Sequence, residues 1–170
     1  SRMTSNQIPP QLIVVSAPSG AGKTSLCARL LEECSDRICL SRSATTRPPR
    51  GEEQNGVDYD FLSMPAFQAA IAESKFAEWA LVHGNLYGTL KSTIEESFQA
   101  GKHVLLDIDV QGAKALRSAF PDRSVLVFIA PPRFEVLGER LRARGTESEE
   151  KIQVRLNNAR RELTETHLFD

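Results

Sequence analysis

Residues 12–24 read Leu-Ile-Val-Val-Ser-Ala-Pro-Ser-Gly-Ala-Gly-Lys-Thr, and this stretch decides the fold. The apolar run over 12–16 leads into a glycine-containing turn, which is followed by Leu26, Leu30 and Leu31 at helical spacing. A buried strand that ends in such a turn and reopens as a helix directs consecutive backbone N–H groups toward one point. The stretch therefore predicts a strand, a phosphate-binding loop and a helix in direct succession.

The turn matches the pattern G-x-x-x-x-G-K-[ST] except at its first position, where Ala17 replaces the glycine. In this pattern the loop amides hold phosphate oxygens, Lys23 reaches the β- and γ-phosphates, and the Thr24 hydroxyl faces Mg²⁺. An ordinary tight strand-to-helix turn is the alternative, but it would not need Lys-Thr after its glycines. The predicted loop comprises Ala17, Pro18, Ser19, Gly20, Ala21, Gly22, Lys23 and Thr24.

The composition of the 170-residue chain is typical of one compact domain with a sizeable core. Its formal net charge of −1 disfavours a general electrostatic surface for nucleic acid or membranes. No apolar run approaches the roughly 20 residues that a membrane span requires, and no secretion signal is recognisable. We expect a cytoplasmic protein whose basic groups serve a local site.

Strand and helix patterns alternate along most of the chain. The runs 104–108 and 125–129 are apolar throughout, as expected for parallel strands that are covered on both faces, and 38–41 is a weaker run of the same kind. Between the runs, apolar residues recur at helical spacing. The pattern predicts an α/β fold with a parallel sheet flanked by helices. The expected helices cover residues 24–33, 91–100, 111–119 and 133–144.

Two segments depart from this alternation. Residues 42–90 are rich in proline and glycine around a short helix near 65–72, and they predict an inserted α+β subdomain. Residues 145–166 form a strongly charged helix after Gly145, which suits a mobile lid. Residues 1–41 and 91–144 would then form the core. The last strand and helix of such a core are expected beyond Asp170.

Two carboxylates follow the apolar run 104–106. A carboxylate at the carboxyl end of a buried parallel strand lies at the ligand-binding edge of the sheet. Asp107 is therefore a candidate for the Mg²⁺ shell, coordinated through water. The alternative is a helix N-cap for the segment that starts near Gln111, and Asp109 fits this alternative better.

The inserted segment holds a second group of candidate residues. Arg47 and Arg50, stiffened by two prolines, can offer paired donors to a second phosphate; a solvated loop paired with nearby carboxylates is the alternative. Glu78 can accept both N1–H and N2–H of guanine, whereas adenine has no N1–H. A surface acid on a strand edge is the alternative for Glu78. Thr89 and Asp109 could complete the reading of the base.

Eight ordered blocks carry a family resemblance: Ser16–Thr24, Ser43–Glu52, Asn55–Tyr59, Phe76–Ala80, Gly84–Thr89, Leu106–Gly112, Pro131–Pro132 and Arg144–Glu150. With them the sequence resembles the guanylate kinases, the ATP:GMP phosphotransferases of the P-loop nucleoside-monophosphate kinase superfamily, over about residues 12–170. The resemblance implies phosphoryl transfer from ATP, with Mg²⁺, to GMP in purine nucleotide metabolism. It says nothing of the oligomeric state.

The resemblance also implies roles for individual residues. The GMP phosphate would be held by Ser43, Arg47, Arg50, Tyr59 and Tyr87, with Glu53 supporting the arginine loop. Guanine would be read by Glu78, Thr89 and Asp109. The transferring phosphoryl group would be covered, when the lid closes, by Arg140, Arg144 and Arg155, while Lys23 and the loop amides hold ATP.

Two departures from the family pattern and two alternative functions remain open. Ala17 is expected to tighten the phosphate loop without removing its donors, and Leu86, at a position where tyrosine is frequent, leaves one aromatic wall of the site in question. The chain could instead be a non-catalytic guanylate-kinase-like binding module. It could also be a related P-loop kinase for another phosphorylated small molecule, which would not need Glu78, Thr89 and Asp109 together.

Overall fold

The main sheet has four parallel strands in the order β2-β7-β1-β8. The computed structural model describes residues 8–18, 23–130, 134–145, 147–163 and 169–170, except for the side chains of residues 23, 24 and 134. Strand β1 (Leu12–Ser16) lies between β7 (His103–Asp107) and β8 (Ser124–Phe128), and β2 (Ile38–Leu40) pairs with the outer side of β7. The carboxyl ends of β1 and β7 therefore meet at one edge, because Val15 is in register with Asp107.

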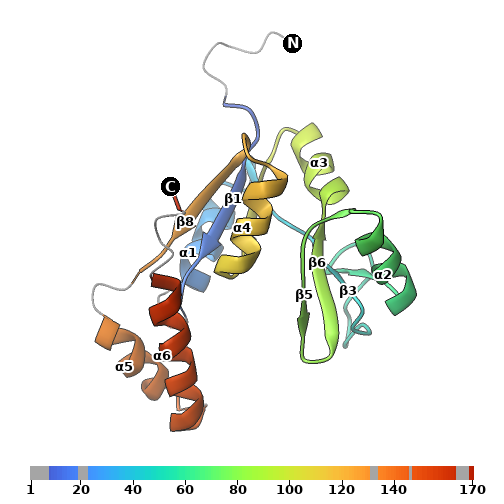
Figure 1. The fold of residues 1–170 in the computed structure, drawn as a ribbon. Coiled ribbons are helices and arrows are strands. Elements are labelled where there is room, and N and C mark those ends of the chain that lie inside the picture. The colour runs from blue at the N-terminus through green and yellow to red at the C-terminus, as the bar shows by residue number, and fades with distance from the viewer. Residues whose placement is uncertain (1–7, 19–22, 131–133, 146, 164–168) are drawn as a thin grey trace.

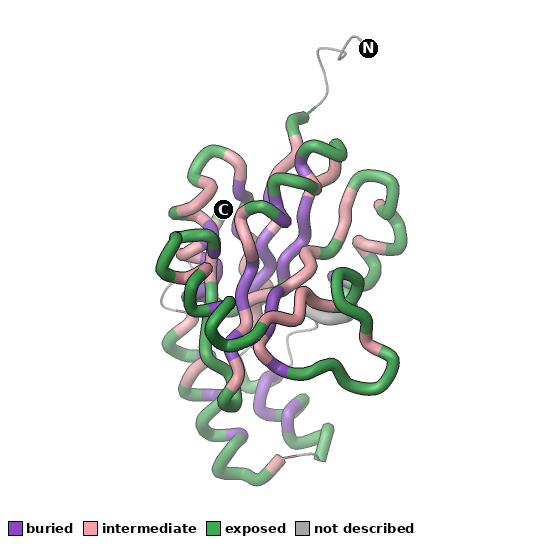
Figure 2. Tube along the Cα trace, turned by 90° about the vertical axis from the view of Figure 1, so that its right-hand side faces the viewer, coloured by how far each residue is buried: buried purple, intermediate pink, exposed green. Residues whose placement is uncertain are grey.

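Helices cover both faces of this sheet, as the continuous apolar runs predict (Figure 1). One face packs on α3 (Lys91–Gln99) and α4 (Val110–Ala119) through a cluster that includes Val14, Leu106 and Leu116. The opposite face packs on α1 (Lys23–Glu33), where Cys27 contacts the cluster of Val15 and Leu105. Figure 2 shows the buried stretches gathered in the middle of the molecule. Adjacent strand residues thus alternate between two separate cores.

A second sheet, in the order β4-β3-β6-β5, is built from residues 44–90. Strands β3 (Ala44–Thr45) and β4 (Asp60–Phe61) are short, whereas β5 (Phe76–Val82) and β6 (Asn85–Leu90) form an antiparallel hairpin. Helix α2 (Met64–Ala72) packs on this sheet, and its N-terminus is capped by the Ser63 hydroxyl, which accepts a hydrogen bond from the amide of Ala66. The sheet and α2 share a core of their own, made of Ala44, Phe67, Phe76 and Leu86.

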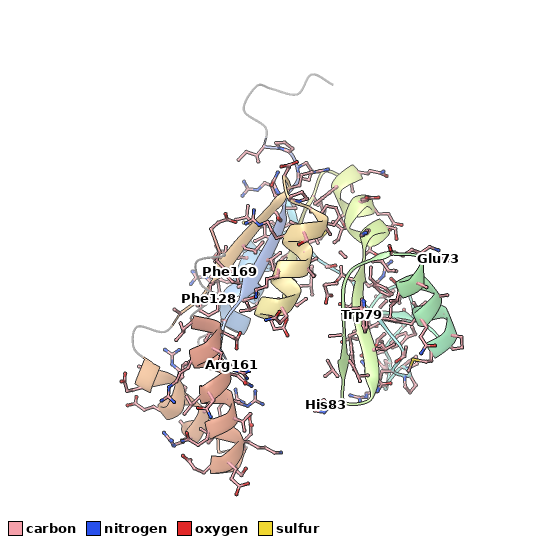
Figure 3. The ribbon with its side chains drawn as sticks, viewed as in Figure 1. Glu73, Trp79, His83, Phe128, Arg161 and Phe169 are labelled. Atoms are coloured by element: carbon pink, nitrogen blue, oxygen red, sulfur yellow. The ribbon has the colours of Figure 1, made fainter. Side chains whose placement is uncertain are left out.

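The conformation of the hairpin turn explains how the chain reverses direction between β5 and β6 within two residues. His83 and Gly84 both have positive φ angles, 49° and 82°. Two consecutive residues of this kind form the turn whose twist matches that of the flanking strands. At the other end of β5, Ala77 packs into the main core beside Ile94. The second sheet is therefore tied to the main body near the start of β5, while the hairpin turn lies at the far end (Figure 3).

Helices α5 (Phe134–Arg144) and α6 (Glu149–Leu163) pack on each other. Leu137, Leu141, Ile152, Leu156 and Ala159 form a cluster of buried residues from these two helices alone. Figure 1 shows the pair beyond the carboxyl end of β1, below the main sheet, with the second sheet on the other side of the picture. The two helices therefore have a core distinct from that of the main sheet.

The sequence-based expectation of an α/β fold is confirmed, with differences at the element ends. The strands expected at 104–108 and 125–129 each lie one residue earlier, and the strand expected at 38–41 ends at Leu40. Strands β3 and β6 were not expected. Beyond α6, Asp170 lies along β8, where its backbone N–H donates to Leu126 and its carboxylate accepts from the Leu126 amide. The rings of Phe169 and Phe128 also meet there (Figure 3).

Candidate active site

A cavity of about 590 Å³ opens at the carboxyl edge of the main sheet, between the ends of β1 and β7 and helix α6. In a parallel α/β sheet this edge is where ligands bind. The cavity places residues of the phosphate loop, the two strand-end acids and the charged helix around one space. Its lining comprises Ala17, Asp107, Ile108, Asp109, Val110, Gln111, Arg155, Asn158, Arg161 and Glu162.

Only part of the predicted phosphate loop can be placed. Ala17 lines the cavity, and the hydroxyl of the preceding Ser16 donates to the carbonyl oxygen of Ile108 at 2.5 Å. This bond joins the start of the loop to the segment between β7 and α4. Residues Ser19, Gly20, Ala21 and Gly22 lie outside the described residues, as do the side chains of Lys23 and Thr24. Helix α1 begins at Lys23, so the last two residues of the predicted loop belong to the first turn of this helix.

The two acids after β7 have different surroundings. Asp109 is the N-cap of α4, because its carboxylate accepts from the backbone N–H of Gly112 at 2.7 Å. The capping alternative is therefore confirmed for Asp109, although its carboxylate still lines the cavity. Asp107 is the last residue of β7; it is exposed and lines the same cavity as Ala17. Its position matches the expectation of a carboxylate beside the phosphate loop.

The donor set at this edge is compatible with Mg²⁺. No group of three His, Cys, Asp or Glu side chains that could hold a metal ion occurs in the part of the chain that the structure describes. Mg²⁺ keeps several waters and is usually bound by one or two carboxylates together with the phosphates of a substrate. The single carboxylate of Asp107 in an open cavity fits that mode.

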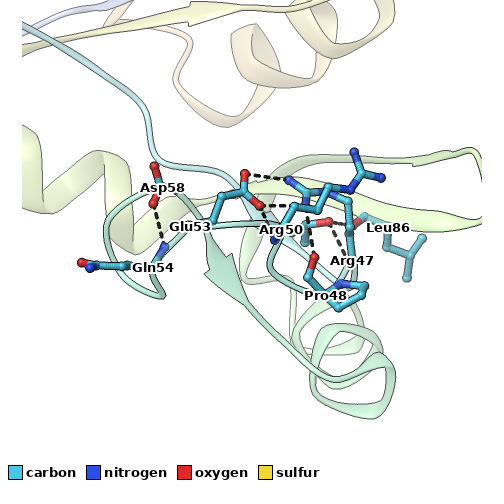
Figure 4. A network of polar contacts seen from close by, with 8 residues as sticks. Arg47, Pro48, Arg50, Glu53, Gln54, Asp58 and Leu86 are labelled. Atoms are coloured by element: carbon cyan, nitrogen blue, oxygen red, sulfur yellow. Dashed lines mark hydrogen bonds and ion pairs between the residues drawn. The ribbon is translucent and has the colours of Figure 1, made fainter.

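Arg47 is held in the second sheet by a bidentate pair with Glu53 (Figure 4). Its Nη1 and Nη2 donate to Oε1 and Oε2 of Glu53 at 2.8 and 3.1 Å, and only 7% of the arginine side chain is exposed. Glu53 also accepts from the backbone N–H of Arg50 at 2.8 Å. These contacts lower the pKa of Glu53 to about 2, chiefly through the Arg47 hydrogen bonds. Arg47 is thus buried and paired with a nearby carboxylate, as the alternative to phosphate binding also expects, whereas Arg50 is exposed.

Two tyrosines complete this basic group. The guanidinium of Arg47 lies 5.0 Å from the ring centroid of Tyr59, and the rings of Tyr59 and Tyr87 meet edge to face at 6.4 Å. The hydrogen bonds to Glu53 raise the pKa of Arg47 above its usual value, and hydrogen bonds with the hydroxyls of Tyr59 and Tyr87 raise it as well. Ser43 lies immediately before β3, where its carbonyl oxygen accepts from the amide of Asp60. The five residues predicted to hold one phosphate thus come from neighbouring strands and the β3–β4 loop.

Glu78 projects from β5 toward the same side of the sheet as Thr89 on β6, its partner in the strand register. The Thr89 hydroxyl donates to Oε1 of Glu78 at 2.8 Å, and Thr89 is fully buried. Burial raises the pKa of Glu78, the charge of Asp109 raises it further, and the hydrogen bonds from Thr89 oppose the rise. The structure therefore brings together the three predicted base-reading residues, and Glu78 is no isolated surface acid.

Leu86 lies on the other face of β6 from Tyr87. It is buried against Ala44, Phe67 and Phe76, in the core beneath α2. Because successive strand residues point to opposite faces, Leu86 does not share the face of Glu78 and Tyr87. In this structure the side chain at position 86 therefore belongs to the core of the second sheet and not to the face that carries Glu78 and Tyr87.

Helix α6 contributes residues that sequence reasoning missed. Asn158, Arg161 and Glu162 line the cavity together with Arg155, which was predicted. Positions 155, 158 and 162 follow helical spacing, and Arg161 is adjacent, so the side chains share one face of the helix. Figure 3 shows Arg161 near the end of α6 that lies toward the main sheet. That spacing was visible in the sequence, but it indicated a cavity only once the position of α6 was known.

The remaining predicted arginines lie on α5. Arg140 and Arg144 are exposed and one helical turn apart, and Arg144 is the last residue of the helix. Neither belongs to the cavity lining, whereas Arg155 does. Among the described residues, no helix combines the length and apolar character that crossing a membrane requires.

Comparison with known proteins decides the family. The family model described as guanylate kinase matches residues 9–170. The chain belongs to the guanylate kinase family. It is 51% identical over 159 residues to the guanylate kinase of Syntrophotalea carbinolica, covering 94% of this chain and 75% of that protein. To the guanylate kinase of Anaeromyxobacter dehalogenans it is 49% identical over 157 residues, covering 92% and 69%.

A solved structure gives the same family assignment. The crystal structure of guanylate kinase from Anaplasma phagocytophilum matches with a TM-score of 0.65 at 30% identity, covering 96% of this chain and 76% of that chain. The predicted family and enzyme class are thus confirmed: the protein is a nucleotide kinase that phosphorylates GMP with ATP. Neither the non-catalytic module nor the kinase for another small molecule is favoured by any of these similarities.

Proposed function

We propose that the enzyme divides the reaction between its two sheets, with ATP at the carboxyl edge of the main sheet and GMP on the second sheet. The reaction is an in-line transfer of the γ-phosphoryl group of ATP to the α-phosphate of GMP, giving ADP and GDP. The acceptor phosphate is already anionic at neutral pH, so positioning and charge neutralisation carry the catalysis. The observation that carries this proposal is the group of Glu78, Thr89 and Asp109, in which Thr89 donates to Glu78 and the charge of Asp109 acts on the same carboxylate.

The acceptor phosphate is held by Arg47 and Arg50, with the hydroxyls of Ser43, Tyr59 and Tyr87. Glu53 occupies one edge of the Arg47 guanidinium through two hydrogen bonds. Nη1 also donates to the carbonyl oxygen of Pro48 at 3.1 Å, so of the five N–H donors the Nε–H and one Nη2–H are left, on the side of the tyrosine hydroxyls, to meet the phosphate oxygens. The buried ion pair thus holds Arg47 in one orientation before GMP arrives, which lowers the entropic cost of binding.

The base is read by Glu78. Its Oε1 accepts from the Thr89 hydroxyl, and both of its carboxylate oxygens take part in accepting from the base. Guanine presents two adjacent donors, N1–H and N2–H, and a carboxylate accepts both. Adenine has neither the N1–H nor the 2-amino group, so it would leave the half-buried carboxylate of Glu78 with the Thr89 hydroxyl and without these donors of the base. Thr89 and Asp109 complete the recognition. We infer that residues 42–90 form the GMP-binding subdomain.

The donor is held by the phosphate loop, residues 17–24, with Lys23 at the β- and γ-phosphates. Asp107 and the Thr24 hydroxyl are the residues that would hold Mg²⁺, in the case of Asp107 through water. The ion supplies charge neutralisation for the transferred phosphoryl group when it is bound. Asp107 lies beside Ala17 in the cavity lining, which supports its place near the loop.

The lid supplies the cations between donor and acceptor. Arg140, Arg144 and Arg155 come from α5 and α6, which share one core. We propose that these two helices move as one unit, so that the lid includes α5 as well as residues 145–166. Closure brings the arginines over the transferring group and excludes water, which would otherwise hydrolyse ATP.

A coupled assay of ADP formation tests the proposal directly. With ATP and Mg²⁺, we expect rapid turnover with GMP and turnover with AMP lower by at least a factor of about 100, because recognition depends on charge-assisted hydrogen bonds to guanine donors. A control reaction with ATP and without an acceptor nucleotide measures the ATP hydrolysis that an incompletely closed site allows. Equal rates with GMP and AMP would contradict the base-reading group, and GMP binding without any turnover would indicate a non-catalytic module.

A further inference from the structure

Glu147 joins two of the lid arginines. It lies between α5 and α6, and only 15% of its side chain is exposed. Its Oε2 accepts from Nε of Arg155 at 2.8 Å, and its Oε1 accepts from Nη2 of Arg144 at 3.3 Å. One carboxylate thus connects the last residue of α5 to the second turn of α6. Nothing in the roles inferred above makes use of this carboxylate.

The geometry points to Glu147 as a positioning residue that holds Arg144 and Arg155 together as one unit over the transferring phosphoryl group. The inference rests on the proposed function, because that proposal places these two arginines on the reacting group. Arg155 lines the cavity with Asp107, so the pair is anchored at the side where the donor phosphates are expected. The two guanidinium groups are fixed relative to each other through one side chain.

Glu147 itself uses only a small part of the donor capacity of the two arginines. Glu147 takes only the Nε–H of Arg155, and only one Nη2 hydrogen of Arg144. Four of the five N–H donors of each guanidinium are therefore not used by Glu147. The carboxylate also separates two like charges that would otherwise repel each other, and its pKa is lowered chiefly by the hydrogen bond from Arg155. Glu147 supports the arginines without competing for the donors that reach outward.

Arg47 and Glu53 repeat this design on the acceptor side. There too a carboxylate with limited exposure holds a phosphate-binding arginine through one edge. Holding cations in position before the reaction matters because misplacement by about 1 Å can cost a factor of about 100 in rate. The enzyme therefore supports the arginines on both sides of the transferred group with carboxylates.

A neighbouring ion pair provides a matched control. Glu149 also connects the two helices: it accepts from Nη2 of Arg142 at 2.6 Å and from Nε at 3.1 Å. This pair is exposed at both partners, and neither residue lines the cavity. Glu149→Gln removes a link between the helices of the same kind as Glu147→Gln, but it leaves the predicted phosphate-contacting arginines intact.

The experiment measures kcat, the KM for GMP and the melting temperature of Glu147→Gln, Glu147→Asp, Glu149→Gln, Arg144→Met and Arg155→Met in the full chain. For Glu147→Gln we expect kcat to fall by about tenfold or more, with an unchanged KM for GMP and a melting temperature close to that of Glu149→Gln. Glu147→Asp keeps the charge and should recover part of kcat. Glu149→Gln should keep the wild-type kcat.

A double-mutant cycle identifies the route of the effect. If Glu147 acts through Arg155, Glu147→Gln should lower kcat far less in the Arg155→Met background than in the wild type. A normal or raised kcat for Glu147→Gln, with a lowered kcat for Arg155→Met, would overturn the inference and leave the proposed function standing. Wild-type kcat in Arg155→Met and Arg144→Met would instead overturn the proposed role of the lid. A large additional loss of melting temperature in Glu147→Gln, with fully additive effects, would also overturn the inference.

Discussion

Replacing Glu78 by glutamine should separate GMP recognition from folding. The carboxylate accepts from Thr89 at 2.8 Å, and Oε1 of a glutamine can keep that bond. The amide group then takes the place of the second oxygen, where it directs N–H donors at the N–H donors of guanine. One charge-assisted hydrogen bond is worth about 1.5–3 kcal/mol. We therefore expect kcat/KM for GMP to fall by about 10- to 150-fold.

The same substitution should not destabilise the protein. Burial and the charge of Asp109 raise the pKa of Glu78, which means that the ionised form is disfavoured in the folded state. The stabilising contribution of such an acid is present below its unfolded pKa and is lost as the pH rises through its folded pKa. A glutamine does not ionise, so at neutral pH the variant does not lose stability in this way. We expect its melting temperature to equal or exceed that of the wild type.

The pH dependence gives a further readout. Because GMP binding needs the ionised carboxylate, kcat/KM for GMP should fall as the pH drops toward the raised pKa of Glu78. This decline should begin at a higher pH than for an ordinary glutamate, and Glu78→Gln should lack it.

The assay is steady-state ADP formation with GMP and ATP varied in turn, together with thermal unfolding. Glu73→Gln is the control, since Glu73 is an exposed acid of the same region that pairs with Lys75. It should change neither the KM for GMP nor the melting temperature. Equal losses of affinity for GMP and ATP in Glu78→Gln, or a melting temperature several degrees lower, would refute the reasoning and assign Glu78 a structural role.

Three further substitutions test other parts of the site. Lys23→Ala should lower kcat by at least a factor of about 100 in the coupled assay, because it removes a charge contact to the transferred group; wild-type turnover would exclude this role. Glu53→Gln should raise the KM for GMP by about tenfold through loss of a charge-assisted bond to Arg47, while the KM for ATP stays constant; parallel changes in both would point to a general folding defect. Phe67→Ala removes a fully buried ring stacked 4.3 Å from Phe76 and should cost about 3–5 kcal/mol in the free energy of unfolding, measured in urea; a cost below about 1 kcal/mol would contradict the assigned core of the second sheet.

Local patterns account for the elements that sequence reasoning placed correctly. The strands of the main sheet are continuous apolar runs because both faces are covered, and this pattern is visible in a single segment. Strand β6 was missed because Gly84 and Gly88 interrupt its pattern. The Cβ of any residue at position 88 would lie 2.8 Å from the ring of Phe76 and from the carbonyl oxygen of Glu78. That glycine reflects a close approach between strands, which no local pattern reveals.

The sequence by itself determined the strand over 12–16, the helix that begins at Lys23, the capping carboxylate of Asp109 and the chemical types of the site residues, since each depends on neighbours within a few positions. Only the tertiary structure decided that Glu78 lies near Asp109, that Arg155 and Asp107 line one cavity, and that Glu147 joins Arg144 to Arg155. It also directed Leu86 into the core beneath α2. These relations depend on how separately formed elements pack, because contacts between distant segments are set by burial and strand register that no short stretch of sequence contains.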